Sequence, residues 1–386
     1  MDEDKNILMK KLRYDEINAI FETEILSHLP LNTLKNCKYV SKSWSNIIKS
    51  QYFFRLHLQK SVLQNRLNLI LFNATTRIIE TFEADALLPS HGTPKPYKVT
   101  LDQNFNILGS CNGLLCFGFD KIHHGSETKL IVLNPATRVW KSVRVLPVPN
   151  QVQNLKAHIN SRGFGFTCDI KTMDYKFVLI VDREIHVYSL KSEAWKRIGD
   201  YSCTFPLREP QRNKCIQAKG VATDNALHWF YGSQGRIKGI FSLDLTDNKQ
   251  YETPIPELYG LPKLVPLKGC LHVVFTKYVT MSGAYPANML EIDIWRMEKY
   301  GGWEDSWVRL FKVQFDDVIF HATAVCFKEG GRKVLLELHP VDMEVLRYVW
   351  YDLVTKERVS EVLEYSAKIK AESCFESLID PNFLKF

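Results

Sequence analysis

LIVLNPATRVWKSV, residues 130–143, decides how most of this chain is interpreted, because variants of it recur along the sequence. LILFNATTRIIETF, residues 69–82, aligns with it position by position, with Asn73 against Asn134 and the same Thr-Arg pair following. Each copy joins an apolar strand to a polar turn and then to a second strand that carries an aromatic residue. This pattern predicts a β-hairpin.

Related hairpins begin near residues 70, 131, 186, 241, 292 and 349, which gives a spacing of 51 to 61 residues. Shorter apolar strands lie between them, for example at 111–119 and 226–232. Four short strands in each 50 to 60 residues is the period of a kelch-like propeller blade. The six units therefore predict a six-bladed kelch-like β-propeller, with an irregular β-sandwich as the alternative.

The segment EILSHLPLNTLKNCKYVSKSWSNIIKSQYFFRLHL, residues 24–58, has a different pattern, with apolar residues at helical spacing in three bursts. Pro30 ends the first burst, Asn32 is expected to cap the second helix, and Ser41 precedes the third. Three helices this short bury too little surface to fold alone. The sequence thus predicts an α+β multidomain protein whose helical module needs a partner.

The same segment closely resembles the F-box of plant F-box proteins. The Leu-Pro pair, the Val-Ser-Lys-Ser-Trp segment and a final Phe-x-x-x-His-Leu element occur in the family order. The resemblance implies a three-helix F-box that docks on a Skp-type adaptor, and through it on the cullin and RING subunits of an SCF ubiquitin ligase. It implies that these residues pack the module or contact the adaptor: Ile25, Leu26, Leu29, Pro30, Leu34, Val40, Ser41 and Trp44.

One position departs from the family pattern, since Ile17 and Asn18 stand where Leu-Pro usually opens the first helix. Proline is pre-organised for a first helical turn and asparagine is not, so adaptor binding could be weaker. Two alternatives therefore remain open. The module could be a helical bundle packed on its own C-terminal domain, or the protein could be a non-ligase binding module with a degenerate F-box.

The repeated segments extend the resemblance. NGLLCF, LNPATRVWKSV, VYSLKSEAWKRI and VWYDL resemble the F-box-associated interaction domain of a plant group that includes S-locus pollen proteins and regulators of immune-receptor turnover. The implied organisation is a charged extension at 1–16, an F-box at 17–62 and a β domain at 66–386. The implied function is to bring a target protein to ubiquitination and proteasomal degradation, as a non-catalytic subunit.

Composition agrees with this interpretation and argues against others. The net charge of +7 comes from 50 basic and 43 acidic residues that are dispersed, so nucleic acid is not an expected partner. Residues 25–60 hold six basic residues and no carboxylate, which suits an acidic partner. No apolar run is long enough to span a membrane, and no secretory signal is present, so we expect a cytoplasmic or nuclear protein.

The chemistry-bearing residues form no pattern typical of an enzyme. Nine cysteines are scattered without a Cys-x-x-Cys pair, so neither a metal nor a disulfide framework is predicted. Gly109–Gly113 contains a serine but lacks the spacing of a nucleophile elbow, and we expect a turn there. His123 and His124 have no ligand-spaced neighbours. We therefore expect no catalytic residue, no metal and no cofactor.

The surface that binds the target is not identified by the sequence. Trp140, Trp195 and Trp307 stand at equivalent hairpin positions and are predicted to pack blade against blade, whereas His228 is a weak surface candidate. Loops carry variation on a rigid scaffold. Target contacts are therefore expected in the irregular polar loops at 89–98, 150–162, 203–215 and 276–288.

Overall fold

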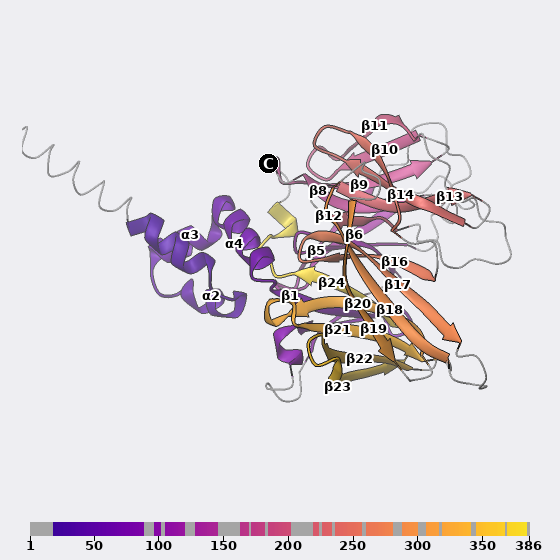
Figure 1. Cartoon of the computed structure of the whole chain (residues 1–386). Helices are drawn as coiled ribbons and strands as arrows, with labels where there is room; N and C mark the ends of the chain where they lie inside the picture. The colour runs from indigo at the N-terminus through magenta and orange to yellow at the C-terminus, as the bar shows by residue number, and fades with distance from the viewer. Residues whose placement is uncertain are drawn as a thin grey trace, which may run out of the picture.

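The protein consists of a small helical module beside a ring of six antiparallel sheets, as the computed structural model in Figure 1 shows. The structure describes residues 18–383 except 89–95, 102–104, 120–127, 146–162, 170, 182–183, 202–218, 224–225, 234–235, 257–259, 281–287, 300–305, 316–318, 341–344 and 367–368. Six four-stranded sheets confirm the six-bladed propeller. The sandwich alternative is wrong.

The strands follow one another blade by blade. The first three blades contain β1 (Leu67–Asn73), β2 (Ile78–Glu83), β3 (Tyr97–Thr100), β4 (Phe105–Cys111), β5 (Leu114–Phe119), β6 (Thr128–Asn134), β7 (Val139–Val145), β8 (Phe164–Asp169), β9 (Asp174–Val181), β10 (Glu184–Ser189) and β11 (Ala194–Asp200). The last three contain β12 (Val221–Thr223), β13 (Ala226–Ser233), β14 (Arg236–Asp244), β15 (Gln250–Pro254), β16 (Leu261–Leu267), β17 (Cys270–Thr280), β18 (Asn288–Met297), β19 (Trp307–Phe315), β20 (Ile319–Lys328), β21 (Lys333–Pro340), β22 (Val345–Asp352) and β23 (Glu357–Ser366).

The ring is closed by the C-terminal strand β24 (Ile369–Phe375), which pairs with β1 along its whole length. The first sheet therefore has the order β24-β1-β2-β3, with β24 beside β4 and β20, the innermost strands of the neighbouring blades. Apolar residues pack between adjacent blades, as where Phe72 of β1 meets Phe117 of β5 with ring centroids 5.6 Å apart. Closure by β24 thus fixes the two ends of the domain to each other.

The recurring hairpin has a physical basis in its turn. Asn134 Oδ1 accepts hydrogen bonds from the backbone N–H groups of Ala136 and Thr137, and Arg138 adopts a positive φ of 64°. The turn that Asn73 opens repeats this, as do the turns opened by Asp169 and Asp352. An Asn or Asp side chain replaces missing backbone partners, and the left-handed residue four positions later turns the chain back.

One repeat occupies an unexpected position. The hairpin at 130–143 forms the third and fourth strands of its sheet, but the hairpin at 69–82 forms the second and third. The reason is that β24 supplies the innermost strand of the first sheet, so the N-terminal segment begins one strand further out. The six units give the correct number of blades, although the first unit is not topologically equivalent to the other five.

The helical module contains helical residues 18–27, α2 (Leu31–Cys37), α3 (Lys42–Lys49) and α4 (Gln51–Leu63). The sequence predicts three helices, and the structure adds a break between α3 and α4. Ser50 is extended there, with φ −76° and ψ 146°, and its Oγ accepts from Phe53 N–H as the N-cap of α4. Ser41 caps α3 in the same way by accepting from Trp44 N–H at 3.1 Å.

Candidate protein-docking sites

The module has a closed apolar core that includes one residue from the far end of the chain. Leu26, Leu34, Ile48 and Phe53 are buried together, and Leu378 lies among them. Figure 1 shows how this is possible, because the yellow C-terminal segment lies between α4 and the propeller. The partner that the short helices require is therefore supplied in part by the chain itself.

Residues 376–379, called here the C-terminal clasp, hold the module against the propeller. The side-chain amide of Asn134 donates to the carbonyl oxygens of Ser377 and Ile379, at 2.9 and 2.8 Å. Ile379 packs with Leu58 of α4 and with residues of the second and third blades. The clasp follows β24 directly, so closure of the ring and attachment of the module are parts of one structure.

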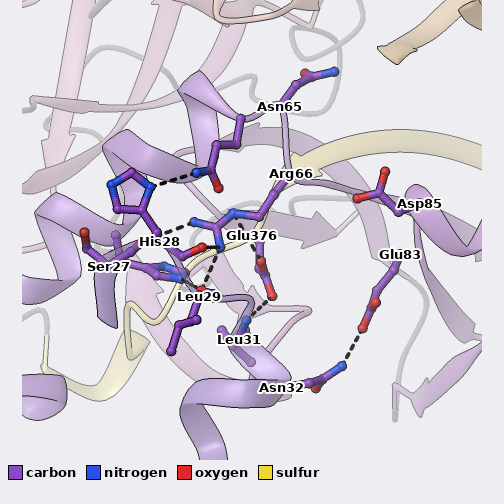
Figure 2. A network of polar contacts seen from close by, with 12 residues as sticks. Ser27, His28, Leu29, Leu31, Asn32, Asn65, Arg66, Glu83, Asp85 and Glu376 are labelled. Atoms are coloured by element: carbon purple, nitrogen blue, oxygen red, sulfur yellow. Dashed lines mark hydrogen bonds and ion pairs between the residues drawn. The ribbon is translucent and has the colours of Figure 1, made fainter. Parts of the chain in front are cut away.

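Arg66, just before β1, binds the end of the first helix. Its Nη1 donates to the carbonyl oxygen of Leu29 at 2.7 Å, close to the carbonyls of Ser27 and His28 (Figure 2). A guanidinium placed at a helix C-terminus satisfies carbonyls that have no partner within the helix. Arg66 therefore fixes the direction in which the first helix leaves the propeller.

Glu376 performs the complementary task at the start of α2. Its Oε1 accepts from Leu31 N–H at 2.7 Å, and its Oε2 lies 3.8 Å from Nε of Arg66 (Figure 2). Burial raises the pKa of Glu376, while the Leu31 N–H and Arg66 act against that shift. The N-cap residue of α2 is Pro30, which has no side-chain acceptor, so Glu376 supplies the cap from 345 positions away.

This arrangement corrects the capping role predicted for Asn32. Asn32 lies inside the first turn of α2, and its side-chain amide donates to Glu83 Oε1 at 2.6 Å (Figure 2). The side chain therefore joins the module to β2 of the first blade. The module is therefore packed on its own C-terminal domain, which was one of the two alternatives left open by the sequence. A second face of the module does not contact the propeller.

The uncovered face is apolar. Five side chains, called here the docking face, are mostly exposed: Ile20, Phe21, Ile25, Tyr39 and Val40. The first three lie on the first helix, and the last two precede α3. A hydrogen bond of 2.9 Å from Ser43 Oγ to Glu22 Oε2 places the start of α3 beside that helix. Contiguous exposed apolar residues mark protein interaction sites.

The eight residues that the resemblance points to divide into two groups. Leu26 and Leu34 are buried in the module core, and Leu29 and Trp44 are half-buried against it. Ile25, Pro30, Val40 and Ser41 are exposed, with Ile25 at 61% and Val40 at 65%. The exposed group is free to contact a partner, and the core residues Leu26 and Leu34 are not. Ile20, Phe21 and Tyr39 were missed, although Phe21 lies four residues before Ile25, at helical spacing, and could have been found from it.

The three tryptophans predicted to pack blade against blade do not all do so. Trp307 is buried and its Nε1 donates to Pro254 of the preceding blade, and Trp195 packs on Phe177 and Tyr188 of its own blade. Trp140 is 50% exposed, so its predicted packing between blades is wrong.

His228 is fully buried between the hydroxyls of Thr223 and Ser242, at 2.8 Å from each, so its interpretation as a surface residue is wrong. Asn112 and Gly113 form the tight turn expected at 109–113.

Several predicted features lie wholly or largely outside the described residues. These are Ile17, His123, His124, the extension at 1–16, and most of the loops proposed for target contact. Within the described ranges no helix is long and apolar enough to cross a bilayer. No three His, Cys, Asp or Glu side chains gather there as metal ligands would.

The helical module and the propeller together define the class of protein. Residues 23–56 match the F-box domain model, and residues 59–339 match the model of the F-box associated beta propeller domain. The chain belongs to the family of F-box proteins that carry this propeller, as the sequence resemblance predicts. An F-box implies binding to a Skp adaptor within an SCF complex.

Proteins of Arabidopsis thaliana are similar over most of the chain. The F-box protein CPR1 is 25% identical, across 96% of this chain and 89% of its own length. The F-box protein At4g22390 is 24% identical, across 92% and 88%. An F-box/kelch-repeat protein, At3g23880, is 22% identical across 75% and 77%. The architecture is that of plant F-box proteins, and it fits an SCF substrate adaptor in general.

Proposed function

We propose that this chain is the substrate-recognition subunit of an SCF-type ubiquitin ligase, acting in the cytosol or the nucleus. The docking face binds the Skp adaptor and the propeller binds a target protein, which is then ubiquitinated and degraded by the proteasome. The division into an extension at 1–16, an F-box at 17–62 and a target-binding domain at 66–386 is part of this proposal.

The observation that carries the proposal is an apolar surface on a module whose own core is already complete. Leu378 and the other buried side chains fill that core, so Ile25 and Val40 are not required inside it. Exposing such side chains to water is unfavourable unless a partner covers them. Residues 25–60 contain six basic residues and no carboxylate, which favours an acidic partner, and Lys60 pairs with Glu24 of the first helix.

The joint between module and propeller suits a subunit that works by proximity. Arg66, Glu376 and Asn134 tie the module to the ring through backbone groups of helices and clasp. A fixed joint keeps the bound target at a defined distance from the other ligase subunits, which raises the effective concentration of its lysines. No catalytic side chain of this chain is needed for that role.

The docking face can be tested without disturbing the module core. The double variant Ile25→Asp, Val40→Asp introduces two charges into the proposed contact and is expected to weaken adaptor binding by at least about tenfold. The measurement is co-purification of the full chain with a Skp adaptor, followed by titration calorimetry. Variants at Leu29 or Trp44 are less informative because both side chains pack on the core.

Val354→Asp is the matched control. Val354 is 71% exposed, but it lies in the turn between β22 and β23 of the propeller. The Val354→Asp variant should bind the adaptor with the same affinity as the unmodified chain. Equal adaptor affinity in the double variant and the control would refute this docking face. Absence of adaptor binding in the unmodified chain would favour the non-ligase binding module instead.

The target can be sought by affinity purification of the full chain from native tissue with the proteasome inhibited. A protein that accumulates with this chain only under inhibition, and that is ubiquitinated in a reconstituted reaction, is the expected result. A bound protein that is not ubiquitinated in that reaction would contradict the ligase function.

A further inference from the structure

A cavity of about 460 Å³ lies in the joint between the helical module and the propeller. Its walls come from three parts of the chain that are far apart in sequence. Phe54 belongs to α4, Val139 and Met173 belong to the second and third blades, and Leu378 and Ile379 belong to the clasp. These side chains make one side of the cavity apolar, and the volume lies in the range of small-molecule sites.

The other side of the cavity is positively charged. Lys38, Lys49 and Arg55 line it, and the single carboxylate among its lining residues is that of Asp380. Asp380 Oδ1 already accepts from Asn382 N–H at 2.8 Å. Burial lowers the pKa of Lys38, and the positive charges of Lys49 and Lys35 lower it further. The surroundings of Lys38 therefore disfavour its positive charge.

Two side chains that line the cavity each carry a buried polar atom with no hydrogen-bond partner among the described residues. They are Nε of Arg55 and Oγ1 of Thr137, which come from α4 and from the turn between β6 and β7. A buried donor or acceptor that is left unpaired is energetically unfavourable. Both atoms belong to groups that can donate to an anionic oxygen.

We propose that this cavity binds a small amphipathic organic anion, which joins the module to the propeller. Its acidic group lies among Lys38, Lys49, Arg55 and Thr137, and its apolar body lies against Phe54, Val139 and Met173. The acid neutralises the positive charge of these side chains, while the apolar body displaces water from the apolar residues of the lining. Because the ligand contacts both domains, it stabilises one orientation of the docking face relative to the propeller.

The probes for this site are a matched pair of dyes. 1-Anilinonaphthalene-8-sulfonate carries an apolar ring system and one acidic group, and N-phenyl-1-naphthylamine is the same ring system without the acid. We expect the sulfonate to bind the full chain saturably with one-to-one stoichiometry, and the neutral dye to bind at least about tenfold more weakly, because a charged hydrogen-bonded contact is worth about that much. The readout is dye fluorescence against protein concentration.

Variants separate this cavity from other apolar surfaces. The double variant Lys38→Gln, Arg55→Gln should weaken sulfonate binding by about tenfold or more. Val139→Trp, which fills the cavity from β7, should abolish it. Lys42→Gln removes an exposed cation of α3 that does not line the cavity, so it should bind as the unmodified chain does. The melting temperature and adaptor binding of each variant show that fold and docking face are intact.

The proposal is overturned if the sulfonate dye does not bind saturably, or if its affinity is unchanged in both the charge variant and Val139→Trp. Equal affinity for the two dyes would also overturn it, because the site would then not select an anion. These outcomes are independent of whether the docking face binds an adaptor.

Discussion

Lowering the pH from 7.5 to 5.5 is expected to reduce the free energy of unfolding by about 5 kcal/mol, because four histidines stay neutral in the folded protein. His57, His228 and His272 have exposed fractions of 0%, 0% and 2%. Burial lowers their pKa values to about 4, about 3 and about 4, from the ordinary value of 6.5, and it lowers the pKa of the partly exposed His321 to about 3. For His57 the nearby Arg66 contributes to the shift.

The sign follows from which state takes up protons. As the pH falls below 6.5, the unfolded chain protonates these imidazoles, while the folded protein does not until about pH 4 or below. The contribution of these neutral imidazoles to the free energy of unfolding is therefore complete above pH 6.5. It is lost as the pH falls from 6.5 towards about 4. Glu337, whose pKa is lowered to about 2, loses its own contribution only below pH 4.5 and does not affect this range.

Urea denaturation at pH 7.5, 6.5 and 5.5 would measure this loss. Replacing His228 by Gln removes one of the four groups, so the stability of that variant should fall by about one quarter less over the same interval. His228 is chosen because it lies inside the fourth blade, away from the module and its joint. A stability that does not change between pH 7.5 and 5.5 would show that these imidazoles are not held neutral by burial.

The fold could be predicted from the sequence because its information is local. Asn134 and Arg138 define a turn within five residues, and the same turn chemistry recurs in the turns opened by Asn73 and Asp352. That chemistry specifies a hairpin, but it does not specify which two strands of a blade the hairpin provides. The first hairpin provides the second and third strands of its blade, because β24 pairs with β1, and nothing near Asn73 reveals that pairing.

The docking site was predictable only in part for a related reason. Ile25 and Val40 could be identified from a local motif, but the sorting of Leu26 to the core and Ile25 to the surface depends on how the helices pack. Glu376 could not be found, because it contacts Leu31 across 345 positions and its residue type alone suggests a solvated surface acid. The contacts of β24 that close the ring, and those of the clasp that attach the module, produce no periodic pattern in the sequence.

Replacing Gly113 by Ala is expected to destabilise the protein by about 3 kcal/mol, since the change combines backbone strain with a steric clash. Gly113 has a φ of 83° in the turn between β4 and β5. An added Cβ would lie 2.0 Å from Cβ of Ser377 and 3.2 Å from the carbonyl oxygen of Phe375. The clasp crosses this turn, so the methyl group must displace it and withdraw Leu378 from the module core.

Gly330→Ala is the matched control, because Gly330 also has a positive φ, 69°, but no atom lies within 4 Å of its added Cβ. It should cost only about 1 kcal/mol of backbone strain. Ser377→Gly in the Gly113→Ala background should recover most of the difference, since it removes the clashing Cβ. Urea midpoints give the free energies, and hydrogen exchange of the Leu31 amide reports on the clasp because Glu376 accepts from it.

The exchange experiment tests whether the clasp fixes the module to the propeller. In Gly113→Ala the Leu31 amide should exchange faster at a urea concentration far below the unfolding midpoint, while amides of the distant blade strands β13 and β14 keep their protection. Faster exchange throughout the propeller would mean that the methyl group disturbs the ring itself. Equal destabilisation by Gly113→Ala and Gly330→Ala would mean that the clasp moves aside freely and does not fix the module to the propeller.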